Sequence, residues 1–111
     1  MPQPPFHPRR GEAYLVSLGT KRRPAVILSV EALNRHALDV CVVGFTSAEH
    51  ASFSIRVPIR AGDGGVSSDC WAKCDQVTTL EKILLRYPAL GRLSDGAFQK
   101  IQDQVRICLG L

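Results

Sequence analysis

Residues 52–59, with the sequence SFSIRVPI, alternate between polar and apolar side chains along their whole length. A period of two places all the apolar residues on one face, which is the pattern of a half-buried β-strand. Pro58 has no N–H to donate to a neighbouring strand, so we expect this segment at the edge of a sheet. The apolar face of such a sheet must be covered by a core, which already favours a small, layered β-protein.

Further segments extend this β pattern. Alternating or β-branched runs predict strands in EAYLVSL, RPAVILSV, ALDVCVVGFTS and CWAKCDQV, with EALNR as a single helical turn between two of them. Residues 60–69 (RAGDGGVSSD) are rich in Gly, Ser and Asp and predict a mobile loop. Near the C-terminus, apolar residues at spacings of three and four predict an amphipathic helix capped by Ser94 or Asp95. The expected fold class is therefore α+β, mainly β: a small barrel or strongly curved sheet with a C-terminal helix.

The chain has 111 residues, which is enough for one domain with a single core. Residues 1–9 contain four prolines and are expected to form a flexible tail, with residues 10–111 as the domain. No apolar run approaches the ~20 residues of a membrane helix, and no export signal precedes the domain, so we expect a cytoplasmic protein.

The four cysteines form no CxxC pair and lie in apolar runs, so they predict buried free thiols. We expect no metal and no cofactor. His7, His36 and His50 are not evidently paired with one another and are expected to be solvated, although His50 follows the FTS segment closely. The net charge of +4 and the pI near 9.1 mildly favour a polyanionic partner.

Two arginines stand directly before Pro24 at the start of a predicted strand. Arg22 and Arg23 either mark the solvated end of that strand or contact phosphate. Alternation along the strand would point the two side chains to opposite faces.

Five segments in order resemble the MazF/PemK (Kid) family of toxin endoribonucleases: GEAYLVSL, RRPAVILSVEALNR, FTS, CDQVTTLEK, and LGRLSD followed by a helix. The resemblance extends over residues 10–111. It implies an SH3-like barrel of the MazF/PemK/CcdB kind, a homodimer, and metal-independent, sequence-selective cleavage of single-stranded RNA through attack by a 2′-hydroxyl. It also implies a MazE-like antitoxin as partner.

The resemblance assigns roles to particular residues. Arg23 matches the arginine that acts at the scissile phosphate, where we expect it to stabilise charge, because a guanidinium is a poor proton donor. Thr46 matches a family threonine that orients a phosphate oxygen or the nucleophile; otherwise its hydroxyl bonds its own backbone. Asp75 would act as a base, accept a hydrogen bond from a base edge, or pair with Arg23.

The remaining candidates are RNA contacts. Lys73 stands where related chains have arginine, which keeps the charge but loses the planar fork. Gln76 either reads a base edge or bonds backbone, and Ser47 adjoins the family threonine. The segment between the first two strands, Gly19 to Arg22, is much shorter than in the family, so we expect an open groove in which Lys21 and Arg22 contact flanking phosphates.

Two functions of different class follow. The first is the toxin endoribonuclease. The alternative is a non-catalytic module of the MazF/CcdB fold that binds protein or nucleic acid through a degenerate RNA groove, because a fold does not determine an activity.

Overall fold

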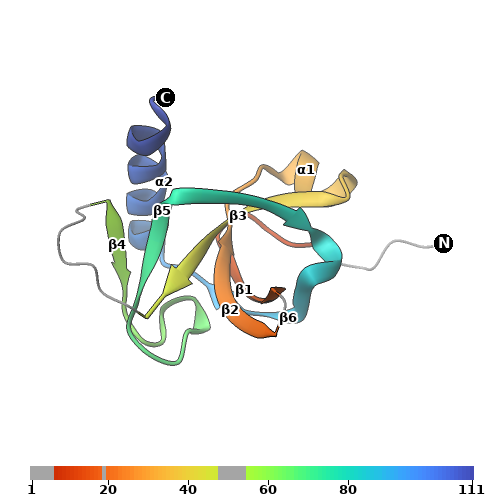
Figure 1. Ribbon diagram of the computed structural model, residues 1–111, viewed down its shortest axis with the longest axis horizontal. Coiled ribbons are helices and arrows are strands. Elements are labelled where there is room, and N and C mark those ends of the chain that lie inside the picture. The colour runs from red at the N-terminus through yellow and green to blue at the C-terminus, as the bar shows by residue number, and fades with distance from the viewer. Residues whose placement is uncertain (1–6, 19, 48–54) are drawn as a thin grey trace.

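The computed structural model describes residues 7–18, 20–47 and 55–111, and in them one antiparallel sheet and two α-helices (Figure 1). The strands follow the order β4-β5-β3-β2-β1-β6 across the sheet. Their bounds are β1 Glu12–Leu18, β2 Lys21–Ile27, β3 Asp39–Thr46, β4 Arg56–Ile59, β5 Cys70–Glu81 and β6 Leu85–Arg92. The helices are α1 Glu31–His36 and α2 Asp95–Leu109, and two short 3₁₀ turns occupy Asp63–Gly65 and Lys82–Leu84.

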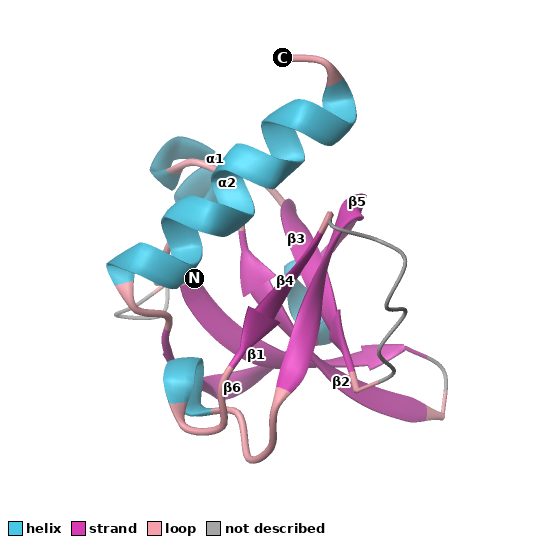
Figure 2. Cartoon of the chain, turned by 90° about the vertical axis from the view of Figure 1, so that its left-hand side faces the viewer, coloured by secondary structure: helices cyan, strands magenta, loops and turns pink. Residues whose placement is uncertain are grey.

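The sheet is strongly curved. In Figure 2, β3, β4 and β5 run upright while β1, β2 and β6 lie across their lower end. The outer strands β4 and β6 are not paired with each other in the described part of the chain, so the sheet remains open rather than closing into a full barrel. The predicted class, α+β and mainly β with a C-terminal helix, is confirmed.

Each face of the curved sheet carries its own core. The core on the α2 face contains Phe45, Ile59, Ile101 and Val105, and Ile101 and Val105 come from the helix itself. The core on the other face fills the inside of the curve. Its buried members are Tyr14, Val16, Ala25, Ile27, Val40, Val42, Leu80 and Leu85.

The C-terminal helix begins at one of the two capping residues that the sequence predicts. The Ser94 hydroxyl accepts a hydrogen bond from the Ala97 N–H at 3.3 Å, which is an N-cap. Gly110 closes the helix in the left-handed region, at φ 72°. The helix packs along the β4–β5 end of the sheet (Figure 1).

The alternating segment that predicted an edge strand ends in β4, which is indeed the outermost strand and contains Pro58. Residues 52–54 lie outside the described part of the chain. The strand β6 was not predicted from the sequence. Pro88 and Gly91 interrupt its apolar pattern, and both are tolerated because β6 is also an edge strand.

Three observations bear on the expectations for the cysteines, the N-terminal tail and membrane-spanning helices. Cys70 and Cys74 are buried as predicted, whereas Cys41 and Cys108 are free but partly exposed. Residues 7–9, expected in the tail, touch the fold: Pro8 is fully buried. No helix in the described ranges is long and apolar enough to cross a membrane.

Candidate functional site

The start of β2 carries the arginine pair on an overhang of the sheet. Residues 21–24 of β2 pair with β1, but pairing with β3 starts only at Ala25, which faces Gly44. Pro24 stands where that pairing stops and has no N–H to extend it. The three cationic residues that precede Pro24 are therefore exposed, whereas residues 25–27 are buried.

A pocket of about 410 Å³ lies beside this overhang, and we call it the strand-end pocket. It brings together five of the predicted site residues, from the start of β2 and from the end of β3 with the residue that follows it. Its far wall comes from the segment before β5. Its lining residues are Lys21, Arg22, Arg23, Pro24, Phe45, Thr46, Ser47, Val66, Ser67, Ser68 and Cys70. Arg22 and Arg23 both line it, although alternation predicted opposite faces, because at the free end of a strand both side chains can reach the same hollow.

A narrower cavity of about 60 Å³, which we call the sheet pocket, lies on the other side of Arg23. It lies over the core on the face of the sheet opposite α2. Its lining residues are Val16, Arg23, Pro24, Ala25, Val42, Gly44, Phe45, Lys73, Gln76, Thr78 and Leu80. Arg23, Pro24 and Phe45 line both pockets. Arg23 therefore stands on the boundary between them.

A bulge in β5 places two further predicted residues, Lys73 and Gln76, beside the sheet pocket. Val43 faces Val77 and Phe45 faces Ala72, so Gly44 alone stands opposite residues 73–76. Such a bulge bends the strand and re-aims its side chains. Within this stretch Cys74 joins the α2-side core, while Lys73 and Gln76 line the sheet pocket.

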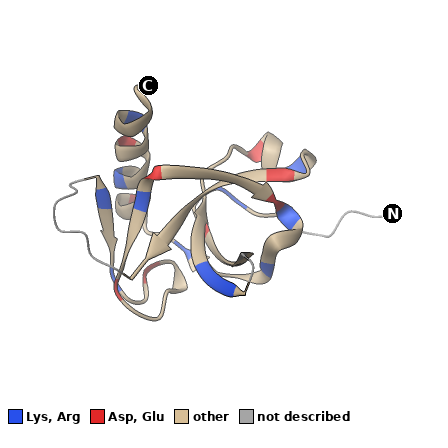
Figure 3. Ribbon diagram, viewed as in Figure 1, with Lys and Arg blue, Asp and Glu red and all other residues tan. Residues whose placement is uncertain are grey.

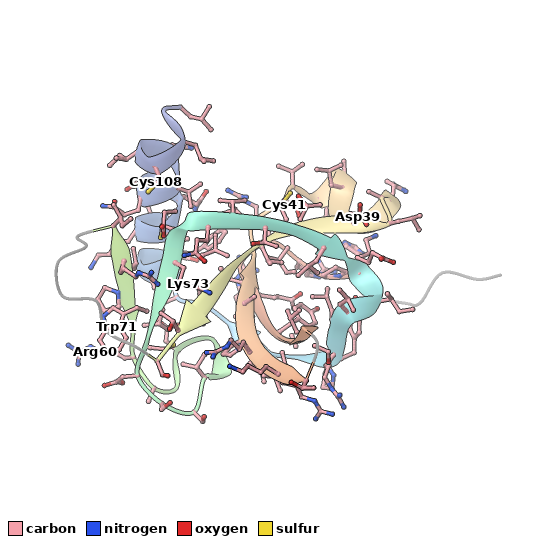
Figure 4. All side chains as sticks on the ribbon, viewed as in Figure 1. Asp39, Cys41, Arg60, Trp71, Lys73 and Cys108 are labelled. Carbon is pink, nitrogen blue, oxygen red and sulfur yellow. The ribbon has the colours of Figure 1, made fainter. Side chains whose placement is uncertain are left out.

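The Lys73 side chain reaches across β3 (Figure 4). A Cβ atom placed on Gly44 would lie 3.4 Å from Lys73 Cε and 3.7 Å from its Nζ. The absence of a side chain at Gly44 therefore leaves room for the ammonium group of Lys73 beside the sheet pocket.

Asp75 lies on the exposed side of the bulge and lines neither pocket. In the described part of the chain, the ion pairs are those of Glu31 with His7 and with Arg35. The pairing of Asp75 with Arg23 that the sequence left open is thus not made.

The two pockets are electropositive. Lys21, Arg22, Arg23 and Lys73 line them, and neither lining includes an aspartate or glutamate. Figure 3 shows the cations at the start of β2 as one continuous stretch. Such a concave cationic surface raises the local concentration of anionic ligands and suits phosphate groups in particular.

The described residues contain no group of three or more His, Cys, Asp or Glu side chains placed to hold a metal ion. Among the histidines, His50 lies outside the described residues. His7 is only 14% exposed, not solvated as expected, and its Nε2 lies 2.5 Å from Glu31 Oε1. This hydrogen bond lowers the pKa of the Glu31 carboxyl. His7 and His36 line neither pocket.

Sequence reasoning missed the far wall of the strand-end pocket, Val66 to Ser68. The loop that contains it was expected to be mobile. Instead, the Asp63 carboxylate accepts hydrogen bonds from the Ser94 N–H (2.8 Å) and hydroxyl (2.9 Å) at the start of α2. The adjacent glycines of the DGG sequence were the only local signal of a close backbone approach.

Known proteins match this chain in sequence and in fold. The family model described as PemK-like, MazF-like toxin of type II toxin-antitoxin system matches residues 9–109. An endoribonuclease from a mycobacterial species, solved in complex with its cognate antitoxin, is 30% identical over 94% of this chain and 96% of its own, with a TM-score of 0.82. Another mycobacterial endoribonuclease is 29% identical over 94% and 92%, with a TM-score of 0.79. MazF in a MazE-MazF crystal structure from Deinococcus radiodurans shares the fold, at 22% identity over 96% and 98% and a TM-score of 0.81.

Proposed function

The chain belongs to the PemK-like, MazF-like toxins of type II toxin-antitoxin systems, and from this membership we propose how it acts as an endoribonuclease. The observation that carries the proposal is the position of Arg23 between two pockets lined by cations. Single-stranded RNA crosses this boundary with its scissile phosphate at Arg23, one flanking nucleotide in the strand-end pocket and the other over the mouth of the much smaller sheet pocket.

The reaction is an in-line displacement within the RNA. The 2′-hydroxyl oxygen attacks the adjacent phosphorus, the bond to the 5′-oxygen breaks, and the products are a 2′,3′-cyclic phosphate and a 5′-hydroxyl. The proton lost by the 2′-hydroxyl and the proton gained by the leaving oxygen are exchanged with solvent. Negative charge accumulates on the non-bridging oxygens in the transition state, where fixed donors act most strongly.

Arg23 supplies that stabilisation. Its planar guanidinium donates to two phosphate oxygens at once. Thr46, at the end of β3 in the strand-end pocket, orients a phosphate oxygen or the nucleophile through its hydroxyl. The positive charge of Arg23 takes the part that a metal ion plays in other nucleases, so the mechanism is metal-independent.

The other predicted residues hold the substrate. Lys21 and Arg22 contact the backbone phosphates along the β2 overhang, and Ser47 contacts the same nucleotide as Thr46. In the sheet pocket, Lys73 contacts phosphate and Gln76 a base edge. Asp75 accepts a hydrogen bond from the base that leaves the sheet pocket over the β5 bulge, because its exposed position suits a contact better than a proton transfer at Arg23.

The partners follow from the family and the charge. A MazE-like antitoxin with acidic side chains covers the cationic pockets, as a mycobacterial relative was solved with its cognate antitoxin. The toxin acts as a homodimer in the cytoplasm, where its RNA substrate is found. The short β1–β2 turn leaves the cations of β2 on the strand itself rather than on a long loop.

End-labelled RNA tests the proposal. Cleavage should leave a 2′,3′-cyclic phosphate and a 5′-hydroxyl, continue in EDTA, and stop when the nucleotide before the cut carries a 2′-deoxyribose. Activity that is lost in EDTA and restored by magnesium would overturn the metal-independent mechanism, and cleavage of the deoxy substrate would overturn 2′-hydroxyl attack. A chain that binds RNA without cutting it would be the non-catalytic binding module.

A further inference from the structure

The far wall of the strand-end pocket has no role in the mechanism above. We infer that Ser67 and Ser68 on this wall read the base of the nucleotide on one side of the cut, and so help to set the cleavage sequence. The inference rests on the proposed function, because it takes the scissile phosphate to lie at Arg23.

The wall is held in place from within the molecule. Val66, directly before the two serines, is buried at 5% exposure in the α2-side core. Gly65 has a φ of 78°, and a Cβ atom there would lie 2.0 Å from the Leu90 carbonyl oxygen of β6. The backbone thus crosses β6 at a distance that only glycine allows, and this crossing fixes where Ser67 and Ser68 emerge.

Hydrogen bonds secure the same segment at both ends. The Gly62 N–H donates to the Val66 carbonyl at 2.8 Å, which closes the turn before the serines. After them, the Asp69 carboxylate accepts from the Ala61 N–H at 2.8 Å. A reading group needs a fixed position, and this framework supplies one.

The serine hydroxyls themselves are available to a ligand. Ser67 and Ser68 are exposed, and neither hydroxyl forms a hydrogen bond with another residue of the described part of the chain. Each can both donate and accept, so together they match the mixed donor and acceptor edge of a nucleobase. They carry no charge, so they add selectivity without adding to the general attraction for phosphate.

The pocket has the composition that a base requires. Pro24 is half-buried and supplies accessible apolar surface, whereas Phe45 and Val66 border the pocket but are only 1% and 5% exposed. The cations of the β2 overhang line the same pocket as the serines. A base lying on the apolar surface would present its edge to Ser67 and Ser68 while its phosphate remains at Arg23. The nucleotide on the other side of Arg23 meets a different wall, with Gln76 and Thr78.

Because the two nucleotides that flank the cut meet different walls, loss of the serine hydroxyls should relax the base preference at only one of them. Loss of one neutral hydrogen bond to a base edge changes discrimination by about 3- to 10-fold, and the two serines should act at the same nucleotide position. Positions read in the sheet pocket should keep their preference.

The experiment compares the parent with Ser67→Ala, Ser68→Ala and the double variant, using a pool of RNA with randomised bases on both sides of the cut. Sequencing of the 5′ ends gives the preference at each position. Competition binding with RNA that carries a 2′-O-methyl group at the cut measures the same discrimination without cleavage. Thr79→Val is the matched control, because it removes an exposed hydroxyl that lines neither pocket.

The expected result is a relaxed preference at one position adjacent to the cut, in both cleavage and binding, with the rate on the preferred sequence within a few-fold of the parent. Unchanged preferences in the double variant would overturn the inference while leaving the proposed cleavage intact. A uniform loss at all positions would also overturn it, because it would show a structural role. If the parent neither cuts nor binds RNA, the proposed function falls and the inference falls with it.

Discussion

Lys73 lies across Gly44, and this contact joins β5 to β3 at the sheet pocket. A Cβ atom on Gly44 would stand 3.4 Å from Lys73 Cε, which is the short limit of ordinary van der Waals contact. Gly44 therefore borders the space that the Lys73 ammonium group occupies, although it carries no functional group of its own.

Gly44→Ala should weaken RNA binding by about 3-fold, less than the loss of a charged contact, because the added methyl group narrows the space beside the Lys73 ammonium group without displacing it. The measurement is the dissociation constant for uncleavable RNA. Gly96→Ala is the control, because a Cβ atom there meets nothing within 4 Å. The effect should disappear when Lys73→Ala is already present, and additive losses in the double variant would show that Gly44 does not act through Lys73.

Arg23→Ala should lower the single-turnover rate at saturating RNA by about 10²-fold or more, as when a preorganised donor to a transition state is removed. Arg22→Ala should mainly weaken binding and reduce the salt dependence by about 0.7 of a slope unit, since it removes one phosphate contact. Arg86→Ala, on the exposed surface of β6 and outside both pockets, should change neither. Equal rates for Arg23→Ala and the parent would exclude Arg23 as a catalytic residue.

Gly65→Ala should reduce the free energy of unfolding by about 2 kcal/mol or more, because it combines an unfavourable positive φ with a clash. Gly62→Ala separates the two causes: its φ is 95°, but a Cβ atom there meets nothing within 4 Å. Denaturant unfolding of both variants measures the difference. If the free energy of unfolding falls no further for Gly65→Ala than for Gly62→Ala, β6 moves aside to accommodate the added Cβ atom.

The free energy of unfolding should fall as the pH rises from about 9 to about 11. Burial raises the pKa of the Cys74 thiol from 9.0 to about 11, so over this range the unfolded chain loses its thiol proton while the folded chain keeps it. The stability is fully present below the lower pKa and is lost as the pH rises toward the higher one, with a slope of at most about 1.4 kcal/mol per pH unit from this group.

Burial also raises the pKa values of Cys70 and Tyr14, so part of the slope comes from them. Denaturant titrations of the parent and of Cys74→Ala across this range isolate the contribution of Cys74. The variant will be less stable throughout, and the comparison is therefore of slopes. Identical slopes would contradict a protonated, buried Cys74.

The protein should be a dimer in solution, with a mass by light scattering of about twice 12.1 kDa. Exposed apolar side chains on this small domain support the expectation. Leu38 and Ile83 are 86% and 84% exposed, and they are close in space because the Lys82 N–H donates to the Leu38 carbonyl at 2.9 Å. A monomer mass at concentrations of tens of micromolar would contradict the prediction.

Much of the fold follows from local pattern. Alternating or β-branched runs predicted β1 to β5, and apolar spacings of three and four predicted α2, because both patterns depend only on residues that are near one another in the chain. Local pattern also identifies the candidate site residues next to Pro24 and at the end of β3. Their positions at strand ends are visible in the sequence, and the family resemblance supplied their roles.

The sequence alone determined the strands β1 to β5, the terminal helix and the cationic and hydroxyl-bearing residues that β2 and the end of β3 bring to the strand-end pocket. Tertiary structure alone decided how they meet: the β5 bulge that sends Lys73 and Gln76 to the sheet pocket, the convergence of Arg22 with Arg23, and the wall formed by Ser67 and Ser68. The physical reason is that each depends on pairing register or on close backbone approach between segments distant in sequence. No local periodicity records such contacts.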